Sequence, residues 1–352
     1  MNAFAVPGFT GRPPPFDAGL TIGTLRSSQR DGEFDGAQCV AFDKRGRLFV
    51  VDTGNARVQV FEPDGSFVLK FGSLGDGDGQ FRAPYAVAID DLNDEAFVTD
   101  SRRGDVQVFS TLDGSFVRSL TRGIELEWPE GICVDSRHRE VLVSSALSCV
   151  VRVLSLSSNS DTQAAPILFA FGVKGSGDGE LQMARGIAVD PQRRIVIADN
   201  MNHRVQVFSR LDDHRASFAL KFGERGMAAG QFRSPNGVCV DHQGRIIVAD
   251  AMNERLQAFS AQGEPIATFA CPEEPWHVAL DQRHARIAFT CGHRVHVIDA
   301  DRLLPFLWCP EHHRFASKAI KQLVLVLLML RAASPIVRPL PNELMFEIFR
   351  FL

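Results

Sequence analysis

Three Asp–Arg pairs, each five residues apart, are the first side chains whose types and spacing could do chemistry. Each pair belongs to one short motif, in which an Asn lies between the two charges. Asp and Asn oxygens gathered in a ring could ligate a metal ion, whereas Asp and Arg on facing strands of a hairpin form an ion pair. Because the motif repeats almost unchanged, we predict the structural role, with each Asn at a turn position of positive φ. The members are Asp52, Asn55 and Arg57; Asp199, Asn202 and Arg204; and Asp250, Asn253 and Arg255.

Other segments that could carry chemistry do not fit their motifs. Residues 75–79 and 175–179 are rich in Gly and Asp, but a calcium loop needs Glu at its twelfth position, which counted from Asp76 is Val87. No G-K-[ST] phosphate-loop ending follows either segment, and no G-x-S-x-G nucleophile motif occurs. Cys133 and Cys239 lie where other copies of the repeat have Ala, which indicates small core residues. We therefore predict no catalytic residue, no metal and no cofactor.

These motifs sit in a repeated unit. An Asp that closes a short apolar strand recurs six times, at intervals of 40 to 55 residues. Each copy contains three or four short strands separated by turn residues, a period and pattern typical of propeller blades. No stretch between residues 34 and 303 has a helical period, which excludes Rossmann and TIM folds. The sequence predicts an all-β, six-bladed β-propeller. The six residues are Asp43, Asp90, Asp135, Asp190, Asp241 and Asp281.

The repeat resembles the NHL repeat, in the frame G-x-x-x-D, turn, strand, D-x-x-N-x-R-V-x-x-F. The resemblance covers about residues 19 to 300. The third copy departs from the frame, with Ser145, Ser148 and Val150 at the Asp, Asn and Arg places, and the sixth has Thr290 at the Asp place. The segment 20–25 is similar to the fourth strand of the first copy but precedes any first strand. We expect it to complete the last blade and so close the ring.

The residue five positions before each strand-closing Asp varies, although its neighbours repeat. In a propeller this position marks the mouth of the central channel, on the face formed by the links between blades. Polar, charged and aromatic side chains free of the repeat suit asymmetric recognition of a ligand. We predict a ligand-binding face made of Gln38, Tyr85, Glu130, Arg185, Asn236 and Trp276, with Arg102, Arg103, His203, Glu254 and His293 in the adjacent turns.

Three ligand classes are open for this face. The first is a protein or peptide, with Tyr85 and Trp276 as aromatic anchors. The second is a metal with a small molecule, as in six-bladed lyases and lactonases, for which Glu130, His277, His203 and His293 are the available ligands. The third is RNA, because the resemblance includes NHL propellers that bind RNA through a basic face. A net charge of −4 and few arginines on the face disfavour nucleic acid.

Composition bounds the setting of the chain. Its 352 residues are 45% hydrophobic and 23% charged, as in globular proteins. The longest apolar run, residues 323–330, is far shorter than the 20 or so residues of a membrane span, and the N-terminus has no secretory-signal pattern. Seven cysteines without a C-x-x-C pair fit a reducing compartment. We expect a cytoplasmic or nuclear protein.

The last fifth of the chain has a different pattern. We predict an irregular arm over residues 1–18, the propeller over 19–303 and a helical tail over 304–352. Within the tail, residues 340–352 resemble the start of an F-box, the helix that docks on the Skp-type adaptor of a cullin ubiquitin ligase. The resemblance implies a substrate receptor without a catalytic site of its own; the alternative is a helix that only packs. The partner-binding residues would be Leu340, Pro341, Leu344, Ile348, Phe349 and Leu352.

Overall fold

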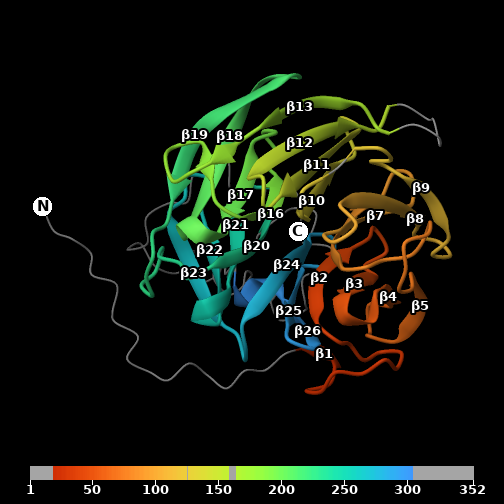
Figure 1. Ribbon diagram of the computed structural model, residues 1–352. Helices are drawn as coiled ribbons and strands as arrows, with labels where there is room; N and C mark the ends of the chain where they lie inside the picture. The colour runs from red at the N-terminus through yellow and green to blue at the C-terminus, as the bar shows by residue number, and fades with distance from the viewer. Residues whose placement is uncertain (1–18, 125, 158–163, 304–352) are drawn as a thin grey trace, which may run out of the picture.

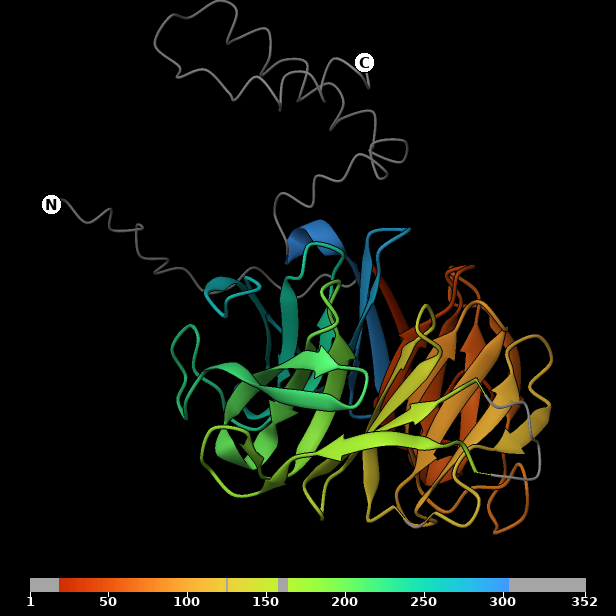
Figure 2. The same cartoon turned by 90° about the horizontal axis from the view of Figure 1, so that it is seen from above.

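The computed structural model describes residues 19–124, 126–157 and 164–303. They form six four-stranded antiparallel sheets arranged as blades around a central axis (Figure 1). Figure 2 shows the ring from its side, with the strands running between its two faces. This confirms the prediction of an all-β, six-bladed propeller. The arm over 1–18 and the tail over 304–352, with its F-box-like start, lie outside the described residues.

Within each blade the strands follow chain order from the axis outwards. Blades 1 to 3 consist of β2 (Ala37–Phe42), β3 (Leu48–Asp52), β4 (Arg57–Phe61) and β5 (Phe67–Phe71); β6 (Pro84–Asp90), β7 (Glu95–Asp100), β8 (Asp105–Ser110) and β9 (Phe116–Ser119); and β10 (Pro129–Asp135), β11 (Glu140–Ser145), β12 (Val150–Ser155) and β13 (Ile167–Phe171).

Blades 4 to 6 repeat this order, with one exception in the last blade. Blades 4 and 5 consist of β16 (Ala184–Val189), β17 (Ile195–Asp199), β18 (Arg204–Asp212) and β19 (Arg215–Phe222); and β20 (Pro235–Val240), β21 (Ile246–Asp250), β22 (Arg255–Phe259) and β23 (Pro265–Ala270). Blade 6 consists of β24 (Pro275–Asp281), β25 (Arg286–Cys291), β26 (Arg294–Asp299) and, as its outer strand, β1 (Leu20–Gly23).

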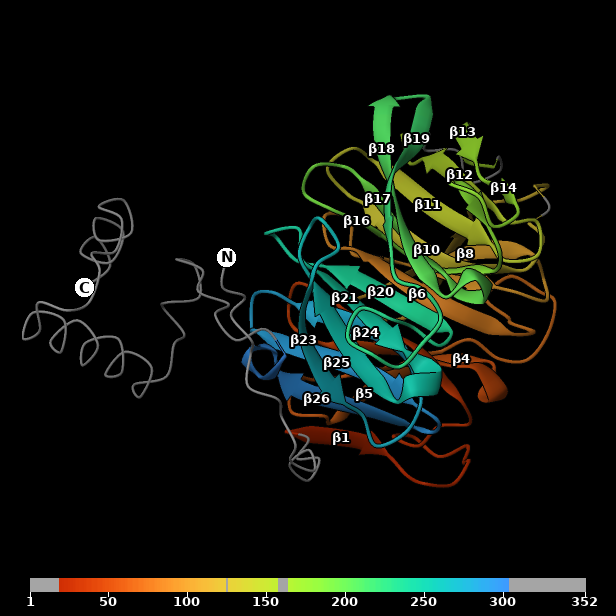
Figure 3. The same ribbon diagram turned by 90° about the vertical axis from the view of Figure 1, so that its left-hand side faces the viewer.

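The hairpin β18–β19 has the longest strands and extends beyond the neighbouring blades (Figure 3). The remaining elements are short. The short elements are the parallel pair β14 (Val173–Lys174) and β15 (Glu180–Leu181), and the 3₁₀ turns η1 (Thr53–Asn55), η2 (Asn200–Asn202), η3 (Ala251–Asn253) and η4 (Ala300–Arg302).

The N-terminal strand closes the ring, as the sequence predicts. Strand β1 pairs antiparallel with β26, in a register that places Leu20 opposite Val297 and Gly23 opposite Arg294. In Figure 1 the red β1 lies beside the blue strands of blade 6, although the two segments are at opposite ends of the propeller sequence. The first and last strands thereby cover each other's free edges.

The repeated phenylalanines form the joints between blades. The second and third strands are buried on both faces, because each blade packs against its neighbours, so they are nearly continuous apolar runs. A Phe in the link before a blade packs on the Phe that ends the third strand of that blade. The ring centroids are 5.4 Å apart for Phe81 and Phe109 and 5.3 Å for Phe232 and Phe259. These pairs account for part of the abundance of Phe in the sequence.

The two faces of the ring are formed by different links and turns. The entry face is where the inner strands begin; it consists of the links between blades and the turns between second and third strands. The exit face carries the other turns and a set of ion pairs that join neighbouring blades. Lys44 Nζ lies 2.8 Å from Asp94 Oδ1, and Arg139 Nη1 lies 2.8 Å from Asp90 Oδ2. The exit face therefore contributes to holding the blades together.

The Asp–Arg motif has the predicted structural role. Asp52 and Arg57 face each other across the β3–β4 hairpin, with 2.7 Å between Oδ2 and Nε. The Arg57 guanidinium also donates to the carbonyl oxygens of Gln29, Arg30 and Glu33 in the preceding link. Each copy thus ties a hairpin to the link that enters its blade.

One detail of that motif is wrong in the sequence analysis. The positive φ falls on Ala56, His203 and Glu254, one residue after each Asn. The residues after Asp form a single 3₁₀ turn that ends with a left-handed residue. The Asn side chain has a different task. Asn55 Nδ2, for example, donates to Asp52 Oδ2 and to the Ser28 carbonyl.

The sixth blade also differs from the prediction. Its inner strand places Pro275 opposite Cys291, as Pro84 lies opposite Asp100 in blade 2. Cys291, not Thr290, therefore stands at the Asp place. Thr290 instead matches Thr99, and its hydroxyl accepts from the His277 backbone N–H as that of Thr99 accepts from Ala86.

Candidate functional site

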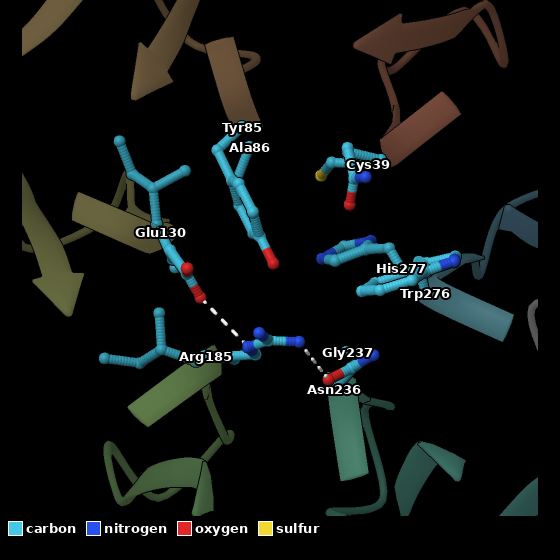
Figure 4. A pocket seen from close by; sticks show the side chains of 14 residues that line it. Cys39, Tyr85, Ala86, Glu130, Arg185, Asn236, Gly237, Trp276 and His277 are labelled. Atoms are coloured by element: carbon cyan, nitrogen blue, oxygen red, sulfur yellow. Dashed lines mark hydrogen bonds and ion pairs between the residues drawn. The ribbon is translucent and has the colours of Figure 1, made fainter. Parts of the chain in front are cut away.

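The structure brings together all six residues predicted at the channel mouth. Each is the second residue of an inner strand, and all six line one cavity. Its volume is about 20 Å³, which is room for one water molecule. Figure 4 shows the labelled side chains converging on this point from different blades. The residues are Gln38, Tyr85, Glu130, Arg185, Asn236 and Trp276.

Glycines make the channel this narrow. The residue after each channel-mouth position faces the next inner strand, and in blades 3 to 5 it is Gly131, Gly186 and Gly237. A Cβ added to Gly131 would lie 1.9 Å from the Arg185 carbonyl oxygen. Only glycine permits this approach, which places the side chains of neighbouring blades within reach of one another.

Arg185 is at the centre of the cavity's polar network. Its Nε lies 3.1 Å from Glu130 Oε2, and its Nη1 donates to Asn236 Oδ1 at 2.9 Å. Its guanidinium carbon lies 5.8 Å from the centre of the Trp276 ring, within range of a cation–π contact. Asn200 Nδ2 donates to the same Asn236 oxygen at 2.6 Å. The guanidinium is therefore held by side chains from three other blades.

Glu130 provides the anionic partner of this network from a buried position. Its side chain is 2% exposed, and the Trp128 indole N–H donates to its Oε1 at 3.0 Å. Burial raises the pKa of Glu130, and Arg185 opposes that rise. Burial and the Glu130 charge together raise the pKa of the Tyr85 phenol, which stays protonated at neutral pH. The mouth thus combines one buried ion pair with a neutral phenol.

His277 lines the same cavity, next to Trp276. Burial lowers its pKa to about 4, so the imidazole is neutral at pH 7. Among the described residues its Nδ1 has no hydrogen-bond partner, and neither does Gln38 Oε1. The cavity therefore presents buried polar atoms that can form hydrogen bonds with a ligand or water.

The cavity opens into a wider funnel on the entry face. The funnel has a volume of about 730 Å³ and shares Gln38, Tyr85, Glu130, Arg185 and Trp276 with the cavity. Its size is that of a ligand-binding cleft. The rest of its wall comes mainly from links and turns of blades 1 to 4, which makes it asymmetric about the axis. These residues are Thr53, Gly54, Leu74, Arg82, Ala83, Ser101, Arg102, Trp128, Leu147 and Met183.

The residues predicted in the adjacent turns divide into two groups. Arg102 lines the funnel, and Glu254 is exposed on the entry face. The other three support the joints between blades. His203 Nδ1 accepts from the Ser234 N–H at 3.1 Å, and His293 Nδ1 accepts from the Gly36 N–H at 2.9 Å. Arg103 donates to the carbonyl oxygens of 77 and 80.

Arg103 takes over the role of the motif arginine. Blade 2 has Asp105 at the place that Arg57 occupies in blade 1. Arg103, two residues earlier, reaches the same link and pairs with Asp105 at 3.0 Å. The sequence pattern hides this because the charge has moved within the turn.

Several residues of the site were missed in the sequence analysis. They include Trp128, Leu74, Leu147 and Met183, which lie in links and turns of the funnel, and Asn200, whose amide donates to Asn236. Trp128 and Leu147 could have been noticed as large apolar residues in loops. Of the metal-ligand candidates named for the enzyme alternative, Glu130 and His277 line the cavity, whereas His203 and His293 do not. The described part of the chain holds no group of three His, Cys, Asp or Glu side chains placed to bind an ion.

Comparisons with known proteins agree with the architecture. A model of the NHL repeat matches residues 181–208 and 232–259, and a model described as a 6-bladed beta-propeller matches residues 33–127. Over residues 19–124, 126–157 and 164–303, no helix is long and apolar enough to cross a membrane.

Relatives share segments of this chain. Protein brain tumor of Drosophila melanogaster is 32% identical over 130 residues, which cover 37% of this chain and 12% of that protein. NHL repeat-containing protein 3 of Mus musculus is 30% identical over 190 residues, which cover 50% of this chain and 52% of that protein. The chain thus spans about half of the second relative's length and much less of the first's.

Solved structures show the same fold at low identity. A gluconolactonase from Xanthomonas campestris aligns with a TM-score of 0.56 and 15% identity, covering 81% of this chain and 99% of that one. A chain of a nidogen/laminin complex aligns with a TM-score of 0.53 and 16% identity, covering 71% and 84%. The chain is a six-bladed β-propeller, and its segments 181–208 and 232–259 match the NHL repeat.

Proposed function

We propose that this protein is a non-catalytic scaffold whose entry face binds a protein or peptide segment. The observation that carries the proposal is the asymmetric funnel of about 730 Å³, whose wall combines aromatic, apolar and arginine side chains. Such a wall is typical of the anchor sites of protein interfaces. The residues at its base vary around a ring whose framework repeats.

Exposed apolar side chains on the rim support this proposal. Leu74 is 75% exposed, Leu147 is 59% exposed and Trp128 is 39% exposed, and all three line the funnel. Met201, Met252 and Met227 are exposed in neighbouring loops of the same face. A group of large exposed apolar residues on one face marks an interaction surface.

A pair of leucines tests the proposal. Leu147 lies on the entry face, and Leu92, which is 67% exposed, lies in the β6–β7 turn of the exit face. Proteins captured from cell extract by the full chain are quantified by mass spectrometry for the wild type, Leu147→Glu and Leu92→Glu. We expect the captured amount of proteins that bind the entry face to fall about tenfold with Leu147→Glu and to stay the same with Leu92→Glu. Equal capture by all three chains would contradict the proposal.

The enzyme alternative, a lyase or lactonase-type activity, depends on Glu130 and the neutral His277 at the cavity. Lactone hydrolysis by the wild type, measured with and without added divalent ions and compared with Glu130→Gln, separates this alternative from a scaffold. A rate above background that is lost in the variant would support catalysis.

The narrower role is that of a substrate receptor in ubiquitin ligation, which rests on the F-box-like residues 340–352. Leu344 and Ile348 are spaced to lie on one face of a helix. Co-purification of a Skp-type adaptor with the wild type, and its loss with Leu344→Glu and Ile348→Glu together, would support this role. Co-purification unaffected by the two substitutions would contradict it.

A further inference from the structure

We propose that the funnel selects an acidic peptide segment in which a carboxylate lies beside apolar residues. The carboxylate binds Arg185 at the base, and the apolar side chains pack on the rim formed by Leu74, Trp128 and Leu147. This assignment rests on the proposed function, because it names the chemistry of the segment that the entry face would bind.

Arg185 is prepared to bind one anion. Glu130 holds its Nε side, Asn236 holds Nη1, and Trp276 covers one face of the guanidinium. Its Nη2 makes no hydrogen bond to any described residue, and its side chain is 20% exposed. A guanidinium already held in place loses little entropy when it binds a carboxylate. Nη2 is the guanidinium nitrogen that has neither a hydrogen bond nor an ion pair with a described residue, so it is the one available to a ligand in the funnel.

The charges of the funnel favour an anion. Its wall contains three arginines and one acid, Glu130, which is buried against Arg185. The positive charge of Arg82 is offset by its ion pair with Asp76. The Arg102 side chain makes no hydrogen bond or ion pair with a described residue, so its charge is uncompensated. The funnel therefore has an excess of positive charge at the rim, although the chain as a whole has a net charge of −4.

The amount of positive charge indicates a carboxylate in preference to a phosphate. Glu130 offsets the charge of Arg185 and lies 3.1 Å from it, so the buried carboxylate repels a bound phosphate dianion about twice as strongly as a carboxylate with a single charge. Phosphate sites and RNA-binding faces use several unpaired cations. In this funnel Arg102 is the one arginine without an anionic partner among the described residues, which suits a ligand with a single negative charge.

The apolar rim indicates a peptide in preference to a small free anion. Leu74, Trp128 and Leu147 surround the arginines and are exposed by a third or more of their surface. A free carboxylic acid would leave these side chains in water, whereas a segment with neighbouring Leu, Phe or Trp covers them.

A selection experiment tests this assignment. Random dodecapeptides displayed on phage are selected against the immobilised full chain, and recovered peptides are synthesised with a fluorescent label and measured by fluorescence polarisation. We expect recovered peptides to be enriched in Asp or Glu next to an aromatic residue or Leu. We expect Arg102→Glu to weaken their binding about tenfold. Arg45→Glu, which changes an exposed arginine on the exit face, serves as the matched control and leaves binding unchanged.

Each other outcome has a definite meaning. Peptides without acidic enrichment whose binding falls with Leu147→Glu but not with Arg102→Glu would overturn the carboxylate assignment and leave the scaffold function standing. Recovery of no peptide above background would count against both. Phosphopeptide versions of the recovered peptides, or a labelled uridine dodecamer, binding more tightly than the acidic peptides would also overturn the assignment.

Discussion

Asp52 Oδ2 and Arg57 Nε lie 2.7 Å apart, and the Asp52 side chain is completely buried. The same carboxylate accepts from the Asp35 backbone N–H at 2.7 Å and from Gln59 Nε2 at 3.2 Å. One buried carboxylate thus links a hairpin, a core strand and the link that enters the blade. Equivalent contacts occur around Asp199 and Asp250.

Asp52→Asn should destabilise the propeller by about 3–5 kcal/mol, because it leaves the buried Arg57 with only the exposed and more distant Asp31 as an anionic partner. Urea unfolding followed by circular dichroism measures this loss. Glu62→Gln removes an exposed carboxylate in the β4–β5 turn and should leave the midpoint unchanged. A small effect of Asp52→Asn would mean that the pair contributes little to holding the blade.

Arg103 and Arg102 are adjacent in sequence, but their substitutions should have different effects. Loss of Arg103 should lower stability, whereas loss of Arg102 should weaken ligand binding. Arg103→Ala removes donors to the carbonyls of 77 and 80 and should cost about 1–3 kcal/mol. Arg102→Ala removes an unpaired side chain and should leave thermal stability unchanged while weakening ligand binding. Differential scanning fluorimetry of the two variants makes the comparison. Equal melting temperatures would contradict the role given to Arg103.

Removal of Arg185 should make stability depend more strongly on pH through Glu130. The pKa of Glu130 is raised in the folded chain, so the folded state binds more protons and stability falls as pH rises from about 4.5. In Arg185→Met this pKa rises further, and the loss between pH 5 and 8 should grow by about 2–4 kcal/mol.

The control for that prediction removes the titrating group as well. The Glu130→Gln and Arg185→Met double variant should show no added dependence on pH over the same interval. Urea unfolding at pH 5 and pH 8 measures the difference. If the single variant has the pH dependence of the wild type, Arg185 is not the main partner of Glu130.

Because of His277, the stability of the folded chain should fall at acid pH. Its pKa falls from 6.5 to about 4 on folding, so the unfolded chain binds the proton first and stability is lost as pH falls through this window. The contribution is at most about 3 kcal/mol. His277→Gln should flatten the decline between pH 6.5 and 4. His214→Gln, at an exposed histidine in the β18–β19 turn, is the comparison, and an equal effect there would contradict the assignment.

The architecture was predictable because every blade packs in the same way and uses the same types of residue at the same positions. The recurring Asp, Gly and Phe mark strand ends, turns and joints, and the extra strand at residues 20–25 indicated how the ring closes. The geometry of the turns was less predictable. Ala56 adopts the left-handed conformation although Asn55 has the higher propensity, because the Asn side chain is engaged with Asp52.

The sequence by itself determined the repeat, the six blades and the six channel-mouth residues, because these follow from local spacing. Only the tertiary structure decided which side chains meet there. Arg185 reaches Glu130, Asn236 and Trp276 from a separate blade in each case, over separations of 51 to 91 residues. No local pattern records such contacts. They arise because ring closure and the glycines of the inner strands bring the blades to within side-chain reach around one axis.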